Sequence, residues 1–255
     1  MERDKVTDAI LKTSNLTKNF KGFTAVNDIN LSVERGHIHA LIGPNGAGKT
    51  TVFNLLTKFL PPTTGTITYD GHDITKRRPA DIANMGVIRS FQISAVFPHL
   101  TAMENVRVGL QRRLGISRQF WRSDRVLGKL NEEALELLSA VGLRDVAETI
   151  TVELPYGSKR ALEIATTLAM DPKLMLLDEP TQGMGVEDVQ AVTGLIRKVA
   201  SGRTILMVEH NLNVVSTLAD RITVLQRGEV LAEGDYREVS SNPEVMSAYM
   251  GAEHE

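Results

Sequence analysis

The sequence predicts an α/β protein with a twisted, mainly parallel sheet flanked by helices, an antiparallel β portion near the N-terminus and an inserted helical lobe. Three observations support this fold class. Short apolar runs typical of buried strands alternate with helical apolar spacing over much of the chain, as in 174–177, 189–199 and 204–208. The region 9–33 instead contains two strand-like segments in succession. From 97 to 154 the pattern is helical, which interrupts the alternation.

The chain has 255 residues, of which 42% are hydrophobic and 24% charged, and this composition is typical of a globular protein with a normal core. We expect one domain, with a core of about 1–96 and 155–255 and a helical lobe of about 97–154. The formal net charge of -2 gives no electrostatic reason to expect nucleic acid as a partner. The absence of cysteine excludes disulfides and thiolate metal sites and is typical of cytosolic proteins. No apolar run in the sequence approaches the roughly 18 residues that span a bilayer.

Two short strands are expected near the N-terminus. One begins at Ala9 and continues through the run that ends at Phe20, and the other covers 26–33, where apolar and polar residues are mixed. Phe20 and Phe23 lie in the connection between these strands. A flat aromatic ring there could stack on a nucleotide base or could belong to the core, and the spacing alone does not decide between the two.

The stretch from Gly43 to Thr51 follows an apolar strand, 38–42, and leads into a segment with helical apolar spacing. Glycines let the backbone wrap closely enough for its N–H groups to point inward at a phosphate, and the following helix N-terminus adds positive partial charge. Lys49 can then reach the terminal phosphates, and Thr50 can offer a hydroxyl to magnesium. The alternative is a tight strand-to-helix turn that contains glycine by chance. The complete pattern in this context favours a phosphate-binding loop.

A further polar candidate, Gln92, lies at the end of the strand expected over 86–92. Before it, the sequence predicts a strand over 66–69 and a short helix that begins at Pro79. A polar side chain at a strand end can reach into a site, although a lone glutamine there is usually a surface residue. The interpretation stays open from the residues alone.

The helical lobe contains an amphipathic helix with Leu130, Ala134 and Leu138 on one face. It also contains a basic stretch, 112–125, in which arginines surround Phe120 and Trp121. Such a stretch could touch lipid headgroups or a partner. A solvated helix face with a few packed side chains is the favoured interpretation.

Two adjacent carboxylates, Asp178 and Glu179, follow the apolar strand 174–177. In nucleotide hydrolases the first carboxylate holds magnesium and a second can orient or deprotonate the attacking water. Taken alone, such a pair is a common entry to a helix, but after a complete phosphate loop it indicates a catalytic site. The strand 204–208 ends similarly in Glu209 and His210. Parallel strands of an open sheet bind ligands at this edge.

The chain resembles the nucleotide-binding subunits of ATP-binding cassette (ABC) transporters, and the resemblance covers nearly the whole sequence. Five segments carry it, in the family's order and roughly its spacing: Gly43 to Thr50, Gln92, Leu154 to Ser158, Leu177 to Pro180, and His210. The resemblance is closest to the ATP-binding subunits of branched-chain amino acid importers, of the larger of their two types. The Leu-Pro-Tyr-Gly form of the signature segment, the long helical insert and the ending 242–251 point there.

The resemblance implies a P-loop NTPase fold of the ABC ATPase kind, with ATP and magnesium as cofactors. Phe20 would stack on adenine, while Thr50, Gln92 and Asp178 would serve magnesium. The signature segment, Leu154 to Ser158, would contact ATP held by a second copy. The residues expected to bind the phosphates are Asn45, Gly46, Ala47, Gly48, Lys49, Thr50, Thr51, Pro155, Tyr156, Gly157 and Ser158.

The resemblance also implies catalytic roles and partners. Glu179 would polarise the hydrolytic water, His210 would touch the γ-phosphate, and Gln92 would sense the membrane subunit. Two cassettes would pair head to tail, as a homodimer or as a heterodimer with a second ABC ATPase subunit. Transmembrane permease subunits would place short helices in a groove between the lobe and Gln92, and a solute-binding protein would be an indirect partner. The subunit would therefore be cytoplasmic and peripheral on the inner face of the membrane.

Three residues depart from the family's usual pattern. Pro155 stands where a serine hydroxyl would help to contact the γ-phosphate, and Ser158 stands where glutamine is usual. Gly185 stands where an aspartate or asparagine normally crosses the dimer interface. Backbone N–H groups near Gly157 and the following helix N-terminus could still bind phosphate. We therefore expect activity, with a slower turnover than the usual signature gives.

The expected function is that of an ATP-hydrolysing subunit that powers an ABC transporter for the uptake of branched-chain amino acids. Subunits of urea or amide importers and of lipopolysaccharide exporters resemble the chain similarly, and the residues give no basis for choosing the solute. A non-transport ABC ATPase of DNA repair or translation usually carries two cassettes or long insertions, which this sequence lacks. A non-catalytic regulatory cassette ranks last because Lys49, Asp178, Glu179 and His210 are all present.

Overall fold

The computed structural model describes residues 8–90, 96–115 and 124–251. Within them the central sheet has the strand order β11-β10-β4-β9-β8-β7, and all neighbours pair in parallel except the antiparallel hairpin of β10 and β11. The bounds are β4 (Ile38–Ile42), β7 (Val87–Ser90), β8 (Leu174–Asp178), β9 (Thr204–Val208), β10 (Arg221–Gln226) and β11 (Glu229–Gly234). The carboxyl ends of the parallel strands therefore meet along one edge of the sheet.

A second, antiparallel sheet is built from the N-terminal strands, in the order β2-β1-β5-β6 with β3 paired to β1. Its strands are β1 (Ala9–Phe20), β2 (Phe23–Ile29), β3 (Ser32–Glu34), β5 (Thr64–Tyr69) and β6 (His72–Asp73). The expectation of one strand over 26–33 is wrong. The Thr13 hydroxyl donates to the carbonyl of Ile29 and accepts from the amide of Leu31, both at 2.8 Å, so it replaces ladder hydrogen bonds where β2 ends and β3 has yet to begin.

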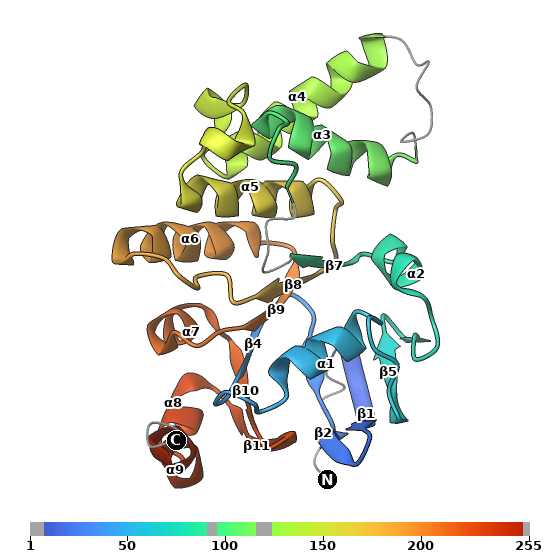
Figure 1. Ribbon diagram of the computed structural model, residues 1–255, viewed down its shortest axis with the longest axis vertical. Coiled ribbons are helices and arrows are strands. Elements are labelled where there is room, and N and C mark those ends of the chain that lie inside the picture. Colours follow the sequence, from blue (N-terminus) through green and yellow to red (C-terminus); the bar gives the residue numbers. More distant parts are fainter. Residues whose placement is uncertain (1–7, 91–95, 116–123, 252–255) are drawn as a thin grey trace.

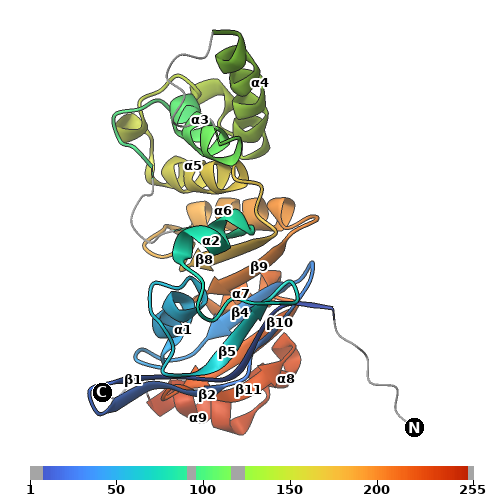
Figure 2. The same ribbon diagram turned by 90° about the vertical axis from the view of Figure 1, so that its right-hand side faces the viewer.

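Helices cover the central sheet and extend beyond it. In Figures 1 and 2, α3, α4 and α5 gather at one end of the long axis, whereas α1 lies beside the antiparallel sheet at the other. The helices are α1 (Lys49–Leu56), α2 (Pro79–Asn84), α3 (Ala102–Arg113), α4 (Asp124–Ala140), α5 (Tyr156–Leu168), α6 (Val186–Val199), α7 (Leu212–Leu218), α8 (Tyr236–Ser240) and α9 (Pro243–Gly251). The mainly parallel sheet, the antiparallel portion and the helical insert confirm the predicted fold class.

Two apolar cores lie on the two faces of the central sheet. Ile38, Ala40 and Ile42 of β4 belong to the core shared with α3 to α9, while Leu41 belongs to the core shared with α1 and the antiparallel sheet. Successive side chains of a strand point to opposite faces, so one strand contributes to both cores. This is why the short apolar runs of the sequence contain no polar alternation.

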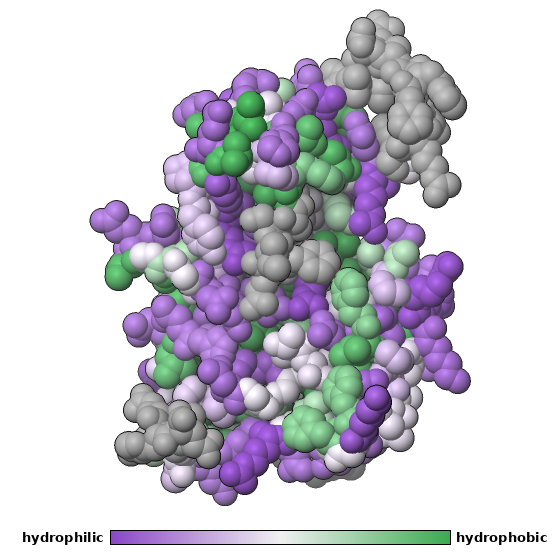
Figure 3. Space-filling model, in the orientation of Figure 1, coloured by the Kyte–Doolittle hydropathy of each residue, from purple (hydrophilic) through white to green (hydrophobic). Residues whose placement is uncertain are grey.

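Parts of two sequence interpretations fall outside the described residues. These are Gln92, with the end of its expected strand, and the centre of the basic stretch, with Phe120 and Trp121. On the face drawn in Figure 3, polar and apolar side chains are interspersed, with apolar ones gathered beside the end of α1. Among the described helices, none combines the length and the apolar character needed to cross a bilayer.

Candidate functional site

The expected phosphate loop connects β4 to α1, and two of its glycines, Gly43 and Gly48, have close backbone neighbours. Gly43 has φ +146°, and a Cβ there would lie 2.1 Å from the carbonyl oxygen of Leu225. Gly48 has φ +100°, and its Cβ would lie 2.6 Å from the carbonyl oxygen of Ala25. Both positions therefore demand glycine for space as well as for backbone conformation.

The N-terminus of α1 is open toward the loop. Gly48 is its N-cap and provides no side-chain hydrogen bond, so the first amides of the helix, among them those of Thr50 and Thr51, have no intrahelical partner. These amides and the helix dipole make a site for an anion. The Asn45 and Gly46 positions of the loop are exposed, whereas Ala47 is buried against the β10–β11 turn, where the amide of Gly228 donates to its carbonyl at 3.0 Å.

Lys49 brings a positive charge into this loop. Its Nζ donates to the carbonyls of Gly43 at 2.7 Å and Pro44 at 2.9 Å, and the side chain is buried. Burial lowers the pKa of the Lys49 ammonium, and the nearby carboxylates of Glu179 and Asp178 partly oppose that shift. A terminal phosphate could take over the donors that the two carbonyls now occupy.

The carboxylates of Asp178 and Glu179 lie at the carboxyl end of β8, as predicted. Glu179 has φ +48°, a left-handed conformation that is strained for a residue with a side chain, and its amide donates to the carbonyl of Val208 at 2.9 Å. Its Oε1 lies 3.0 Å from Nε2 of His210, which comes from the end of β9. Because a carboxylate oxygen only accepts, Nε2 is the donor in this pair. The fold thus brings together two residues that the sequence proposed separately.

Asp178 is buried beside them and carries two differently placed oxygens. Its Oδ2 accepts from a terminal nitrogen of Arg89, whereas its Oδ1 has no hydrogen-bond partner among the described residues. A buried carboxylate oxygen without a donor fits a hard cation, which binds oxygen ligands. Thr50 is exposed at the start of α1, and its hydroxyl could offer a second oxygen ligand of the kind that magnesium takes.

Sequence reasoning missed Glu209, which holds two loops of this edge together. Oε1 of Glu209 accepts from the amide of Thr181 at 3.1 Å and from the Thr181 hydroxyl. Oε2 accepts from the amides of His210 at 2.8 Å and Asn211 at 3.0 Å. The side chain is buried. Its place next to His210 at a strand end was the available signal.

Phe20 lies at the tip of the β1–β2 hairpin, opposite Phe23 in the pairing register. The residue is 41% exposed and belongs to neither core, so its ring is available to a flat ligand. Nζ of Lys18 lies 5.2 Å from the ring centroid, within cation–π range.

The signature segment forms the start of α5. Pro155 is the N-cap and makes no side-chain hydrogen bond, and Tyr156 is exposed with its hydroxyl donating to the carbonyl of Gln182 at 3.2 Å. A Cβ at Gly157 would lie 2.7 Å from Oδ1 of Asp188, while Ser158 is partly exposed. Figures 1 and 2 both show α5 separated from α1 along the long axis. Within one chain the signature segment and the phosphate loop therefore do not form a common site.

Comparisons with known proteins show the family to which the chain belongs. The family model described as ABC transporter matches 26–182, and the model described as branched-chain amino acid ATP-binding cassette transporter matches 229–255. The high-affinity branched-chain amino acid transport ATP-binding protein BraF of Pseudomonas aeruginosa is 39% identical over 252 residues, which cover 95% of this chain and 98% of that protein.

Solved structures are similar as well. The ADP conformation of MJ1267, an ATP-binding cassette of an ABC transporter, has a TM-score of 0.84 at 28% identity and covers 96% of this chain and 100% of that one. The dimeric post-hydrolysis structure of the ATP-binding cassette MJ0796, bound to ADP and Pi, has a TM-score of 0.74 at 27% identity and covers 88% and 98%. Sequence and fold thus indicate the same family.

Proposed function

We propose that this chain powers the uptake of branched-chain amino acids. The chain belongs to the ABC transporter family and is an ATP-binding and ATP-hydrolysing subunit. The identity with BraF over nearly the whole length of both proteins supports the choice of solute class. The match of the C-terminal residues 229–255 to the branched-chain amino acid model supports it independently of the ATPase core.

The observation that carries the catalytic proposal is the pair of Glu179 and His210 beside the phosphate loop. The Glu179 carboxylate orients the attacking water and accepts its proton at a carboxylate oxygen. His210 Nε2, 3.0 Å from Oε1, holds that carboxylate in place and lies on the sheet edge that faces the terminal phosphate. Lys49 and the amides at the start of α1 bind the phosphates, and the ring of Phe20 stacks on the base.

Magnesium is proposed to be held by the hydroxyl of Thr50 and the Oδ1 of Asp178. When bound, it supplies positive charge that neutralises the β- and γ-phosphate oxygens. Gln92, which lies outside the described residues, is proposed as a further ligand from the resemblance alone.

The active form is proposed to be a head-to-tail dimer. Pro155, Tyr156, Gly157 and Ser158 at the start of α5 are partly or fully exposed and distant from their own phosphate loop. A second copy would bring that helix N-terminus to the phosphates, because such a terminus favours an anion. The dimeric MJ0796 structure, similar over 88% of this chain, supports this arrangement.

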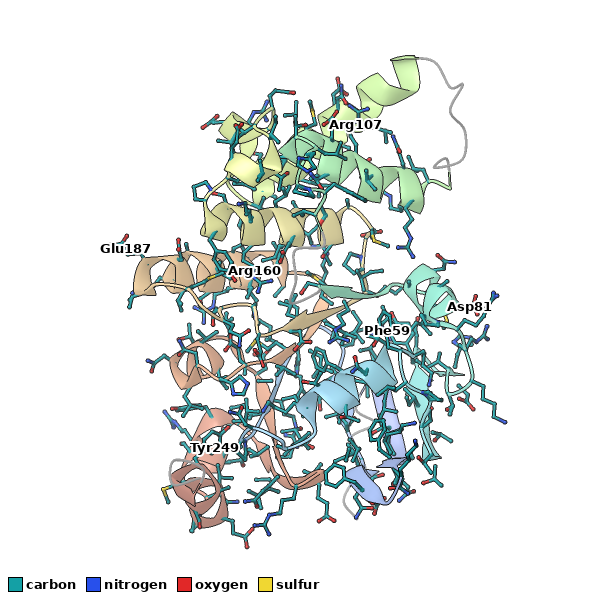
Figure 4. All side chains as sticks on the ribbon, in the orientation of Figure 1. Phe59, Asp81, Arg107, Arg160, Glu187 and Tyr249 are labelled. Atoms are coloured by element: carbon teal, nitrogen blue, oxygen red, sulfur yellow. The ribbon has the colours of Figure 1, made fainter. Side chains whose placement is uncertain are left out.

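The membrane partner is proposed to place a short amphipathic helix in a groove between α2, β7 and the helices α3 and α5. Apolar side chains on its walls remain exposed, among them Phe59 at 55%, Phe97 at 53% and Val108 at 39%. Figure 4 shows Phe59 between α1 and α2, on the side of the molecule from which α2 projects. A helix that buries its apolar face in a groove is a common recognition mode. Permease subunits of an uptake system are the partner of that kind in this family.

The first experiment measures ATP hydrolysis by purified protein and uptake of labelled leucine by cells that depend on this subunit. Lys49→Ala and Glu179→Gln are each expected to lower both rates by about 100-fold or more, since they remove phosphate binding or the general base. Glu132→Gln, on the exposed face of α4, serves as the matched control and keeps both rates.

Capture of Glu179→Gln protein with ATP from detergent-solubilised membranes of the source cell tests the partners. Recovery of polytopic membrane proteins is expected. If only soluble proteins or nucleic acid were recovered, or if leucine uptake persisted in the Lys49→Ala strain, the transport proposal would be abandoned while the ATPase assignment stood.

A further inference from the structure

Arg89 lies at the point where three elements of the site meet. It is the third residue of β7, and β7 pairs in parallel with β8 so that Arg89 is opposite Leu176 and Ser90 opposite Leu177. Asp178 follows Leu177 on β8. The Arg89 side chain thus reaches along the carboxyl edge of the sheet to the carboxylate that is proposed to serve magnesium.

The guanidinium of Arg89 makes contacts with different elements through its separate parts. One terminal nitrogen donates to Oδ2 of Asp178, and the other donates to Oδ1 of Asn54 on α1 at 2.7 Å. The guanidinium carbon also lies 5.7 Å from the ring centroid of Phe53, again on α1. One planar group therefore connects β7, β8 and the helix that carries Lys49 and the phosphate-binding amides.

Both partners of the ion pair are shielded from water, since the side chains of Arg89 and Asp178 are 11% and 1% exposed. A buried carboxylate that loses its partner is left as an uncompensated charge, so the pair constrains where Asp178 can lie. The pair engages Oδ2 and leaves Oδ1 without a hydrogen-bond partner among the described residues. A residue that hydrogen-bonds to a metal-binding carboxylate in this way usually orients the carboxylate and raises its affinity for the metal.

We propose that Arg89 is a positioning residue for ATP hydrolysis: it holds Asp178 by Oδ2 so that Oδ1 faces the magnesium of the bound nucleotide. It also fixes α1 relative to β8 through Asn54, so the phosphate loop and the magnesium carboxylate keep one geometry. In this proposal Arg89 acts through Asp178 and Asn54, the groups to which its guanidinium donates. The inference rests on the proposed magnesium role of Asp178.

The test compares Arg89→Met, Arg89→Lys and the matched control Arg221→Met by equilibrium binding of a fluorescent ATP analogue, once with magnesium and once with EDTA. Arg221 forms an ion pair with Glu233 on the same central sheet, at the opposite end of the strands, with 2.7 Å between Nε and Oε1. For Arg89→Met we expect the Kd of the ATP analogue in EDTA to change less than twofold. The factor by which magnesium lowers that Kd should fall by about tenfold. The magnesium concentration that half-saturates ATP hydrolysis should rise by a similar factor.

Arg89→Lys keeps a charge but not the planar fork, so it should recover part of the magnesium effect. Arg221→Met should behave as wild type in both assays. The proposal is overturned if magnesium lowers the Kd as much in Arg89→Met as in wild type. It is also overturned if magnesium lowers the Kd more in Arg89→Met, because the guanidinium would then have occupied the place of the ion. If Arg89→Met does not fold, judged by circular dichroism, Arg89→Lys and Asn54→Ala decide, with an unchanged magnesium response in both counting against the proposal.

Asp178→Asn separates this inference from the proposed function. If Asp178→Asn weakens the magnesium response and Arg89→Met does not, only the role of Arg89 is wrong. If neither variant changes the response, the magnesium role of Asp178 is wrong as well.

Discussion

The starts of α1 and α5 are both helix N-termini whose N-cap, Gly48 or Pro155, makes no side-chain hydrogen bond. At α1, the open amides lie beside backbone that leaves no room for a Cβ at Gly43 or Gly48, and the buried Lys49 of the same helix has the carboxylates of Glu179 and Asp178 nearby. At α5, the surface is exposed and Asp188 is the near neighbour of Gly157. The difference teaches that an open helix end becomes a complete anion site only where the fold also supplies charge and shields it from water.

The largest expected effect separates two glycines of the phosphate loop. Gly43→Ala should abolish nucleotide binding or unfold the protein, because its Cβ would lie 2.1 Å from the backbone of Leu225. Gly46→Ala meets no atom within 4 Å and suffers only its left-handed φ of +76°, which costs about 1–2 kcal/mol. Nucleotide titration and thermal unfolding of both variants measure the contrast. Equal behaviour of the two would mean that space does not limit this loop.

The next effect concerns the start of α5. Gly157→Ala should leave nucleotide binding unchanged and lower ATP hydrolysis by about 10- to 100-fold. The added Cβ would lie 2.7 Å from Oδ1 of Asp188 and would shift the start of α5 away from its place in the proposed dimer interface. Its near neighbour is the exposed side chain of Asp188, which can rotate, so Gly157→Ala combined with Asp188→Ala should recover part of the activity. A loss of nucleotide affinity in Gly157→Ala would show that the two regions are coupled within one chain.

The smallest effect at neutral pH comes from His39, on the strand that leads into the phosphate loop. Burial lowers its pKa to about 4, with the charges of Arg221 and His37 contributing, and its Nε2 lies 2.8 Å from the hydroxyl of Thr223. Below about pH 6.5, His39 binds a proton in the unfolded chain, whereas in the folded chain it stays neutral until the pH falls to about 4. Stability should therefore fall by about 3 kcal/mol over that window.

Urea denaturation between pH 7 and pH 4 measures this effect. His39→Gln should flatten the acid dependence, whereas the control His72→Gln, at an exposed position, should keep it. An unchanged acid dependence in His39→Gln would assign the loss of stability to other groups.

Local pattern predicted the fold well where a strand is buried on both faces. The runs 174–177 and 204–208 became β8 and β9 because each face of the central sheet has its own core. The break between β2 and β3 could not be predicted in this way. At the break, the hydroxyl of Thr13, which comes from a different strand, donates to the carbonyl of Ile29 and accepts from the amide of Leu31, a contact that local pattern does not reveal. The short helix α7 was not expected either, because its seven residues give little periodicity to detect.

The same distinction holds for the site. Asp178 and Glu179 were identified because they are adjacent to each other and follow a buried strand. The ion pair of Asp178 with Arg89 joins positions 89 residues apart, so only the parallel pairing of β7 with β8 brings them together. The roles of Asp178, Glu179, Phe20, Gln92, His210 and the signature segment stay predictions. Of these, the variants above test Asp178, Glu179 and, through Gly157, the signature segment.

The distance between α1 and α5 within one chain has a genetic consequence in a head-to-tail homodimer. A Lys49→Ala chain keeps an intact α5 start, and a chain with a damaged α5 start keeps an intact phosphate loop. When both chains are expressed in one cell, a mixed dimer contains one site in which the intact phosphate loop of one chain meets the intact α5 start of the other. Each variant expressed alone forms no such intact site. Two recessive, inactive alleles at this locus should therefore complement each other, whereas two alleles damaged in the same region should not.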